Sequence, residues 1–376
     1  MIRRRRVAVG AIAALALIAG VAVGAGSDGD DAPSEGEPAA GPACPPEVAG
    51  APRLLAGQKL IVRMEDEATP ELVEAARDGE IAGVIVFPVA ISEPQDLVPE
   101  IRRLQRAASR GGHPPLLVMI DQEGGAASRF PLHPPQRYPA LLAESGSRRD
   151  SRLEGQATGN FLAEIGVGID LAPVLDVPAS PDSAMALRAF GDTPRRVERL
   201  GVAFAEGLGD EGTVAVPKHF PGLGRAEVST DGAPVTIDAS RRQLRGDLVP
   251  FRAAIEAGVE MIMISLAAYP AYGSDAPAVF SPEVVGDLLR TELGFEGVTI
   301  TDDLEAPGAT GTGVDEGEAA VAAAAAGVDL LLFALGGGDD ARLALARAIR
   351  RGRLDQSALE QSCARLVELR GRAAEG

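Results

Sequence analysis

The sequence predicts an α/β fold, namely a single (β/α)8 TIM-type barrel with an added C-terminal helix. Eight apolar runs rich in β-branched residues recur from residue 59 onward, and segments with helical spacing lie between them. The runs are apolar throughout instead of alternating, which is typical of strands buried on both faces. Eight such strands alternating with helices favour a barrel. An open doubly wound sheet is the alternative, but no G-x-G-x-x-G motif follows the first run to support a dinucleotide-binding fold.

The expected elements follow one another in a regular order. Strands are expected at 59–64, 82–88, 115–121, 167–177, 213–220, 260–266, 297–303 and 328–335. Helical spacing marks 96–110, 193–212, 281–294, 315–327 and 339–352, and a last helix is expected over about 355–372. The five helices between strands begin at Asp, Ser or Thr and end at or just before Gly, as helix capping requires.

Residues 1–25 are expected to be a signal peptide or an N-terminal membrane anchor. MIRRRR is a basic segment, and the apolar run 7–25 follows it directly. This order is typical of an export signal, and the run is also long enough to span a bilayer with its arginines in the cytoplasm. In both cases we expect the rest of the chain to be exported. If the segment is not cleaved, it is the part of the protein that contacts the membrane. Residues 26–46 predict a disordered acidic, Pro/Gly-rich linker, and residues 47–376 form the barrel domain.

The composition limits the class of partner. The net charge is −18, from 36 basic against 54 acidic residues, and the sequence pI is about 4.7. Nucleic acid is excluded as a partner because its phosphates require clustered Lys and Arg. A neutral small molecule is the expected ligand, and we expect the chain to be a monomer.

The chain contains two cysteines, Cys44 at the end of the linker and Cys363 in the last predicted helix. An isolated pair in an exported protein is often a disulfide. We expect a disulfide that ties the end of the linker to the C-terminal helix, with two unpaired thiols as the alternative.

Polar side chains gather where the predicted strands end. Asp121 ends the third strand, Lys218 and His219 end the fifth, and Asp302 ends the seventh, while Arg129 lies in a following loop. Because reactive residues of a barrel collect at the carboxyl ends of its strands, these side chains predict one polar pocket. Carboxylates accept hydrogen bonds from sugar hydroxyls, and Lys and Arg donate to them. A metal-dependent hydrolase is disfavoured because only one histidine is expected at this end.

Four motifs carry a resemblance to a known family: DQEGG at 121–125, RAFG at 188–191, KHFPG at 218–222 and ELGFEGVTITDDLE at 292–305. In this order and spacing the chain resembles the single-domain β-N-acetylhexosaminidase branch of glycoside hydrolase family 3, from about residue 55 to 352. The resemblance implies a TIM barrel, no cofactor and no metal, and a carbohydrate substrate. It further implies a retaining hydrolase of terminal β-linked N-acetylglucosamine and, for an exported member, peptidoglycan fragments as the substrate.

The resemblance also implies the role of each matching residue. Asp302 matches the nucleophile, and Asp303 matches a structural partner of it. The residues that match sugar-binding positions are Asp121, Arg129, Arg188, Lys218 and His219. We expect Lys218 to favour the ionised form of Asp302, since an opposite charge nearby stabilises a carboxylate.

The chain departs from the family in the loop after the fifth strand. The family's acid/base histidine is absent from 224–232, and counting from Lys218 places Asp231 at its position and Ser229 at that of its Asp partner. Counting back from Pro234 places Thr230 there instead. Three hypotheses follow: Asp231 or Glu227 acts as the acid/base, the protein binds a glycan with impaired turnover, or it hydrolyses another β-glycoside or a substrate with a good leaving group. Other family positions differ as well, at Ala126, Leu223 and Leu266.

Overall fold

The protein is represented by a computed structural model that describes residues 43–91, 93–336 and 338–375. The expected signal peptide or anchor at 1–25 lies outside the described residues, and so does the expected linker as far as residue 42. Across the described ranges, no helix combines the length and the apolarity needed to cross a bilayer.

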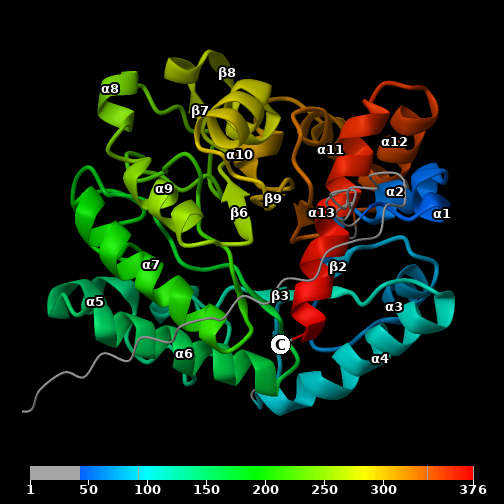
Figure 1. The fold of residues 1–376 in the computed structure, drawn as a ribbon, viewed down its shortest axis with the longest axis horizontal. Helices are drawn as coiled ribbons and strands as arrows, with labels where there is room; N and C mark the ends of the chain where they lie inside the picture. The colour runs from blue at the N-terminus through cyan, green and yellow to red at the C-terminus, as the bar shows by residue number, and fades with distance from the viewer. Residues whose placement is uncertain (1–42, 92, 337, 376) are drawn as a thin grey trace, which may run out of the picture. The chain divides into compact units, whose positions relative to one another are not determined.

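Eight parallel strands, counted over the described residues, form the centre of the fold (Figure 1). Six of them pair in the spatial order β10 (Leu331–Phe333), β1 (Leu60–Met64), β2 (Gly83–Val86), β3 (Leu117–Ile120), β4 (Ile169–Asp170) and β5 (Val214–Ala215). The other two, β6 (Met261–Ile264) and β9 (Val298–Thr301), pair with each other. Parallel bridges from Phe220 to Ile264 and from Ile300 to Leu330 join the two groups into a ring. Each predicted run contains one of these strands, so the predicted fold class is confirmed.

Helices surround the strands (Figure 1). The longer ones are α3 (Pro70–Arg77), α4 (Leu97–Gly111), α5 (Pro139–Ser145), α6 (Arg148–Glu164), α7 (Pro194–Asp210), α9 (Val249–Glu256), the π-helix η5 (Glu283–Glu292), α11 (Glu316–Ala325), α12 (Asp339–Arg350) and α13 (Gln356–Glu375). Shorter elements are α1 (Pro46–Ala49), α2 (Pro52–Gly57), η1 (Pro94–Asp96), η2 (Gly125–Ala127), α8 (Arg241–Leu244), β7 (Ala268–Tyr269), η3 (Pro270–Tyr272), β8 (Ser274–Pro277), η4 (Ala278–Phe280) and α10 (Pro307–Thr310). The six predicted helices correspond to α4, α7, η5, α11, α12 and α13. Capping sets several ends: α11 begins with a capping box between Asp315 and Glu318.

Alternation along each strand divides the core into two layers. Ile61 and Ile300 belong to one buried cluster, formed mainly by strand residues from both sides of the ring. Val62 and Val84 belong to another cluster, which also contains helix residues such as Leu104 of α4. Successive side chains of a strand point to opposite faces, so the first cluster fills the barrel and the second joins strands to helices.

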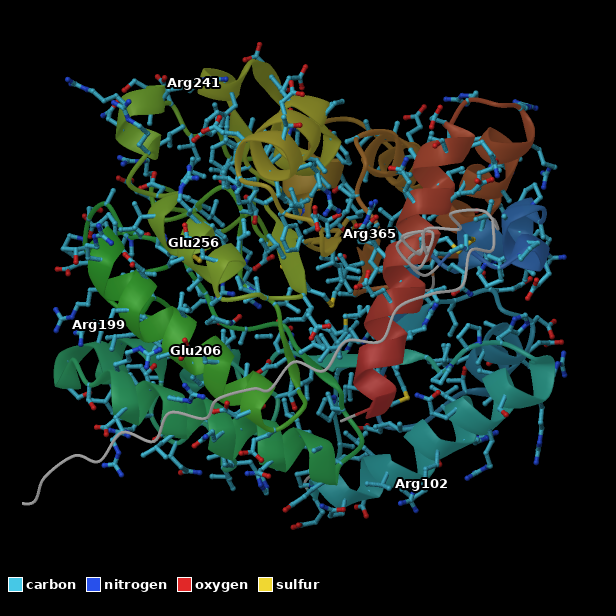
Figure 2. All side chains as sticks on the ribbon, in the orientation of Figure 1. Arg102, Arg199, Glu206, Arg241, Glu256 and Arg365 are labelled. Carbon is cyan, nitrogen blue, oxygen red and sulfur yellow. A yellow bond between two sulfur atoms is a disulfide. The ribbon has the colours of Figure 1, made fainter. Side chains whose placement is uncertain are left out.

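The C-terminal helix α13 packs against the end of the barrel at which strands begin. Arg365 projects from α13 (Figure 2) and its Nη2 donates to Asp329 Oδ1 at 2.7 Å, just before β10. Buried Lys59, just before β1, donates through Nζ to Ser362 Oγ at 2.9 Å. Leu366 joins the cluster that fills the barrel. This arrangement leaves the carboxyl ends of the strands open for a site.

Cys44 and Cys363 form a disulfide, so neither thiol is free. The bond links the segment before α1 to α13. It therefore ties the first described residues to the helix that covers the closed end of the barrel.

Candidate active site

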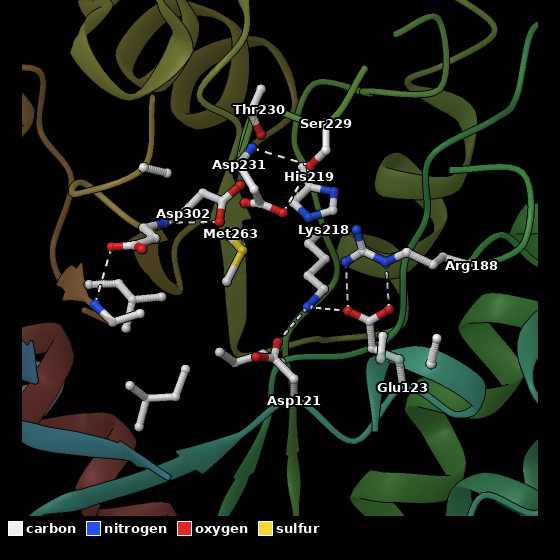
Figure 3. A pocket seen from close by; sticks show the side chains of 18 of the residues that line it. Asp121, Glu123, Arg188, Lys218, His219, Ser229, Thr230, Asp231, Met263 and Asp302 are labelled. Carbon is white, nitrogen blue, oxygen red and sulfur yellow. Dashed lines mark hydrogen bonds and ion pairs between the residues drawn. The ribbon is translucent and has the colours of Figure 1, made fainter. Parts of the chain in front are cut away.

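The carboxyl ends of the strands surround a cavity of about 650 Å³ (Figure 3). It lies at the end of the ring at which the reactive residues of barrels collect. The seven residues that the sequence analysis assigned to the site all line it: Asp121, Arg129, Arg188, Lys218, His219, Asp231 and Asp302. The structure thus brings together residues that are spread over about half of the chain.

Ion pairs connect Lys218, Glu123 and Arg188 along one part of the cavity wall (Figure 3). Lys218 Nζ lies 2.6 Å from Glu123 Oε1 and donates to Asp121 Oδ1 at 2.8 Å. Arg188 donates to both oxygens of Glu123, from Nε to Oε2 at 2.8 Å and from Nη2 to Oε1 at 2.7 Å. Burial acts to raise the pKa of Glu123, but Arg188 and Lys218 outweigh it and hold this pKa well below its usual range. The carboxylate and both cations therefore stay charged and fixed in place.

Arg129 holds the other oxygen of Asp121. Its Nη2 donates to Asp121 Oδ2 at 2.8 Å, and its Cζ lies 3.7 Å from the centroid of the Phe87 ring, within cation–π distance. Burial acts to raise the pKa of Asp121, yet Lys218 and Arg129 lower it overall. Asp121 is thus an ionised, oriented acceptor whose remaining lone pairs can accept from hydroxyl groups.

His219 is held by a carboxylate of its own. Its Nδ1 lies 2.7 Å from Asp176 Oδ2, and Asp176 Oδ1 accepts from the backbone N–H groups of His219 and Leu223 at 3.2 and 2.6 Å. Asp176 is fully buried. An acceptor at Nδ1 orients the ring and holds a proton on that nitrogen, which leaves Nε2 for another partner.

Asp302 directly follows β9 and is partly buried in the cavity wall. Its backbone N–H bonds to Ile264 O at 3.1 Å, and its Oδ1 accepts the backbone N–H of Asp303 at 2.9 Å. Asp303 makes different contacts. Its Oδ1 accepts hydrogen bonds from the backbone N–H groups of Glu305 and Ala334, both at 3.1 Å. Asp303 therefore fixes the turn, although both members of the pair line the cavity.

Several neighbouring groups act on the pKa of Asp302. Burial raises the pKa of Asp302 above its usual value, and Asp231 adds to the rise, while His219 and Lys218 act to lower it. The expectation that Lys218 favours the ionised form is confirmed in direction, since Lys218 acts to lower this pKa, although the net shift is upward. Lys218 is itself bound by two nearer carboxylates, and burial of Asp302 outweighs its influence.

The loop that lacks the expected histidine borders the cavity through Ser229, Thr230 and Asp231. Ser229 Oγ donates to Asp231 Oδ2 at 2.9 Å and accepts from the Asp231 backbone N–H at 3.2 Å. Thr230 O accepts from Gly308 N at 2.8 Å, which ties the loop to α10. Glu227 is exposed and does not line the cavity. Of the two carboxylates considered for the acid/base role, only Asp231 therefore lies at the cavity.

Two carboxylates that organise this geometry were given no role from the sequence, Glu123 and Asp176. Glu123 stands inside the DQEGG motif and Asp176 near the end of the fourth predicted strand, so the signal for both was their position. The remaining histidines lie elsewhere. His133 stacks on Phe161 with ring centroids 4.6 Å apart, and His113 packs beside Gly79, before β2.

Within the described ranges, no group of three or more His, Cys, Asp or Glu side chains is arranged to hold a metal ion.

The model of the glycosyl hydrolase family 3 N-terminal domain matches residues 55–369, which is most of the chain. The chain belongs to glycoside hydrolase family 3. It is accordingly a glycosidase, an enzyme that hydrolyses O-glycosyl bonds.

Individual family 3 members resemble the chain over most of its length. Beta-hexosaminidase LpqI of Mycobacterium tuberculosis is 31% identical, over 96% of this chain and 95% of its own. An uncharacterized secreted glycosyl hydrolase of Arthroderma benhamiae is 32% identical, over 84% and 92%. Two solved structures share the fold. A β-N-acetylglucosaminidase from Paenibacillus sp. str. FPU-7 has a TM-score of 0.83 and 31% identity, covering 86% of this chain, which spans 62% of that one. A β-N-acetylhexosaminidase from Beutenbergia cavernae has a TM-score of 0.75 and 30% identity, covering 85% and 98%.

Proposed function

We propose that this family 3 member is an exported, retaining hydrolase that releases terminal β-linked N-acetylglucosamine. The observation that carries the proposal is the position of Asp302, a carboxylate that lines the same cavity as a set of fixed, paired charges. The names of LpqI and of the Paenibacillus enzyme support a hexosamine as the sugar.

The charged side chains of the cavity are proposed to bind the sugar ring. Asp121 accepts from hydroxyl groups, and Lys218, Arg129 and Arg188 donate to hydroxyl or carbonyl oxygens. These groups already hold one another in hydrogen-bonded pairs, so little reorganisation is needed when a sugar binds. Preorganised polar groups of this kind position the anomeric carbon against a nucleophile.

Asp302 and Asp231 are proposed to divide the chemistry between them. An oxygen of Asp302 attacks the anomeric carbon while a proton passes from Asp231 to the departing oxygen. Water then attacks the same carbon, gives its proton to Asp231 and releases Asp302, so that the configuration is retained. The charge of Asp231 acts to raise the pKa of Asp302, which supports the view that the two carboxyl groups lie close enough to interact.

A second candidate function is glycan binding with impaired turnover. One observation favours it: Asp231 is exposed, whereas a carboxyl that acts as a general acid near neutral pH is usually kept protonated by burial. Weak acid catalysis would leave a sugar-binding cavity that turns over slowly. The two candidates differ in how strongly the rate depends on the leaving group.

Export is proposed on three grounds. The chain begins with a basic segment followed by an apolar run. Cys44 and Cys363 form a disulfide, which persists in oxidising compartments. A relative is named as secreted. Peptidoglycan fragments outside the cytoplasmic membrane are the proposed substrate, and a monomer is the proposed state.

The test is hydrolysis of 4-nitrophenyl β-N-acetylglucosaminide by the purified protein, with the β-glucoside as a comparison for sugar specificity. We expect turnover of the first substrate, its loss in Asp302→Asn, and labelling of Asp302 by a fluorosugar inactivator located by mass spectrometry. Labelling at another residue would overturn the nucleophile assignment. Binding of N-acetylglucosamine by calorimetry without any turnover would establish the second candidate instead.

A further inference from the structure

The cavity carries large apolar side chains that the proposed sugar chemistry does not use. Leu187 is 75% exposed and Leu335 is 67% exposed, and both line the cavity together with Tyr138. Ala126 and Leu223 line it as well. Exposed apolar side chains that gather at a concave site, instead of being scattered singly, mark a surface that binds an apolar group.

The backbone holds these three large side chains in defined positions. Leu187 precedes an arginine that is fixed by two hydrogen bonds to Glu123. The N–H of Leu335 donates to Glu305 Oε2 at 2.7 Å. Tyr138 packs on the glycines of the DQEGG turn. These side chains are therefore held in place although they are exposed, and the apolar surface exists before a ligand binds.

Polar and apolar groups are separated within the cavity. Most of the charged groups are paired and at least partly buried: the side chains of Lys218 and Glu123 are only 3% and 2% exposed, and Asp231 is the exposed exception. The exposed part of the lining contains Leu187 and Leu335 besides Asp231. A second sugar placed there would lose water from its hydroxyl groups without gaining hydrogen bonds from these side chains. An alkyl or aryl group would bury apolar area at no such cost.

We propose that the substrate of this enzyme carries an apolar aglycone, an alkyl or aryl group, and that Leu187, Tyr138 and Leu335 form its binding surface. The inference rests on the proposed function for the sugar half of the substrate, and it replaces the peptidoglycan fragment proposed there by a glycoside with an apolar aglycone. It also bears on the absent histidine, because an aryl oxygen leaves as a weaker base than a sugar alkoxide and needs less help from an acid. For an aryl aglycone the exposed Asp231 is then adequate, whereas an alkyl aglycone gains from the apolar surface alone.

The experiment is a series of alkyl β-N-acetylglucosaminides from methyl to octyl, used below their micelle concentrations. The basicity of the leaving oxygen changes little beyond the shortest members, while the apolar area grows. We expect kcat/KM to rise with chain length, by up to about fourfold per methylene where burial is complete. The double variant Leu187→Asn/Leu335→Asn should flatten this rise. The matched control Leu343→Asn, at a leucine 45% exposed on α12 and outside the cavity lining, should leave it unchanged.

Calorimetry with the corresponding non-hydrolysable thioglycosides separates this inference from the proposed function. Affinity that rises with chain length in the wild type, and less in the double variant, supports the apolar site even if no glycoside is hydrolysed. Hydrolysis with kcat/KM and affinity independent of chain length would retain the proposed function and overturn the inference. A rise that the double variant retains in full would also overturn it.

Discussion

Replacing Glu123 by alanine removes the partner that two cations share. Its side chain is 2% exposed, both of its oxygens accept from Arg188, and Lys218 Nζ lies 2.6 Å away. In the variant, Arg188 loses both of these hydrogen bonds, and Lys218 keeps only its hydrogen bond to Asp121. The positive charges of Arg188 and Lys218 then share one negative charge fewer.

Breaking a buried ion pair by removing one partner costs about 3–5 kcal/mol, because an uncompensated charge stays behind. Arg188 is 25% exposed, so water relieves part of its cost, and we expect the lower end of that range. Glu198→Ala is the matched control, since Glu198 pairs with an arginine that is 85% exposed. Exposed ion pairs contribute about 0–1 kcal/mol.

Urea unfolding followed by circular dichroism measures the difference. With a slope of about 3 kcal/mol/M, the unfolding midpoint should fall by about 1 M for Glu123→Ala and by less than about 0.3 M for Glu198→Ala. Calorimetry should also show weaker binding of N-acetylglucosamine to Glu123→Ala, because Lys218 and Arg188 lose their orientation. Equal midpoint shifts for the two variants would refute the view that Glu123 holds a buried array together.

Three further predictions concern protonation and the disulfide. Asp231→Asn removes a like charge beside Asp302, so the pKa of Asp302 should fall toward its usual value and the acidic limb of the kcat/KM profile should move to lower pH on 4-nitrophenyl β-N-acetylglucosaminide; an unmoved limb would count against the pairing. Burial raises the pKa of Asp170 to about 8, and its Oδ2 has no hydrogen-bond partner. The folded state thus keeps a proton that the unfolded chain loses above about pH 4, and stability falls as pH rises toward 8. Asp170→Asn should reduce that fall, while the raised pKa values of Asp302 and Asp303 leave a remainder, as urea midpoints at about pH 5 and about pH 9 would test. Cys44→Ser opens a link between residues 319 apart in sequence and should cost about 2–4 kcal/mol of stability; a reductant should then destabilise the wild type and leave the variant unaffected.

The strands were predictable because a strand that is buried on both faces consists of a continuous run of apolar residues. The helix α6 was not predicted, and its glycines are explained by packing. A Cβ on Gly155 would lie 2.2 Å from Phe204 O, and one on Gly207 of α7 would lie 2.2 Å from Arg152 O. Glycine lowers helix propensity, yet the close approach of α6 to α7 requires it. The close contact between the two helices therefore selects glycine, although glycine weakens the helical pattern in the sequence.

Site residues were predictable where they end a strand, as Lys218 and Asp302 do. The pairing of Glu123 with Arg188 was not, because it joins positions 65 apart in the sequence. The net pKa shift of Asp302 was missed for a related reason. It depends on burial, and on which carboxylates already engage Lys218.

The absent histidine and the apolar cavity lining have one explanation in common. A general acid contributes on the order of 10²–10⁴ in rate when the leaving oxygen is strongly basic. Asp231, exposed and held by Ser229, is the residue proposed for that acid in this chain. The deficit shrinks as the leaving group becomes a weaker base, and aryl groups are both weaker bases and apolar. A substrate of that class would need less from Asp231 and would gain binding energy from Leu187 and Leu335. The two departures therefore predict one correlation: the leaving groups that are least sensitive to Asp231→Asn should also be those most sensitive to Leu187→Asn.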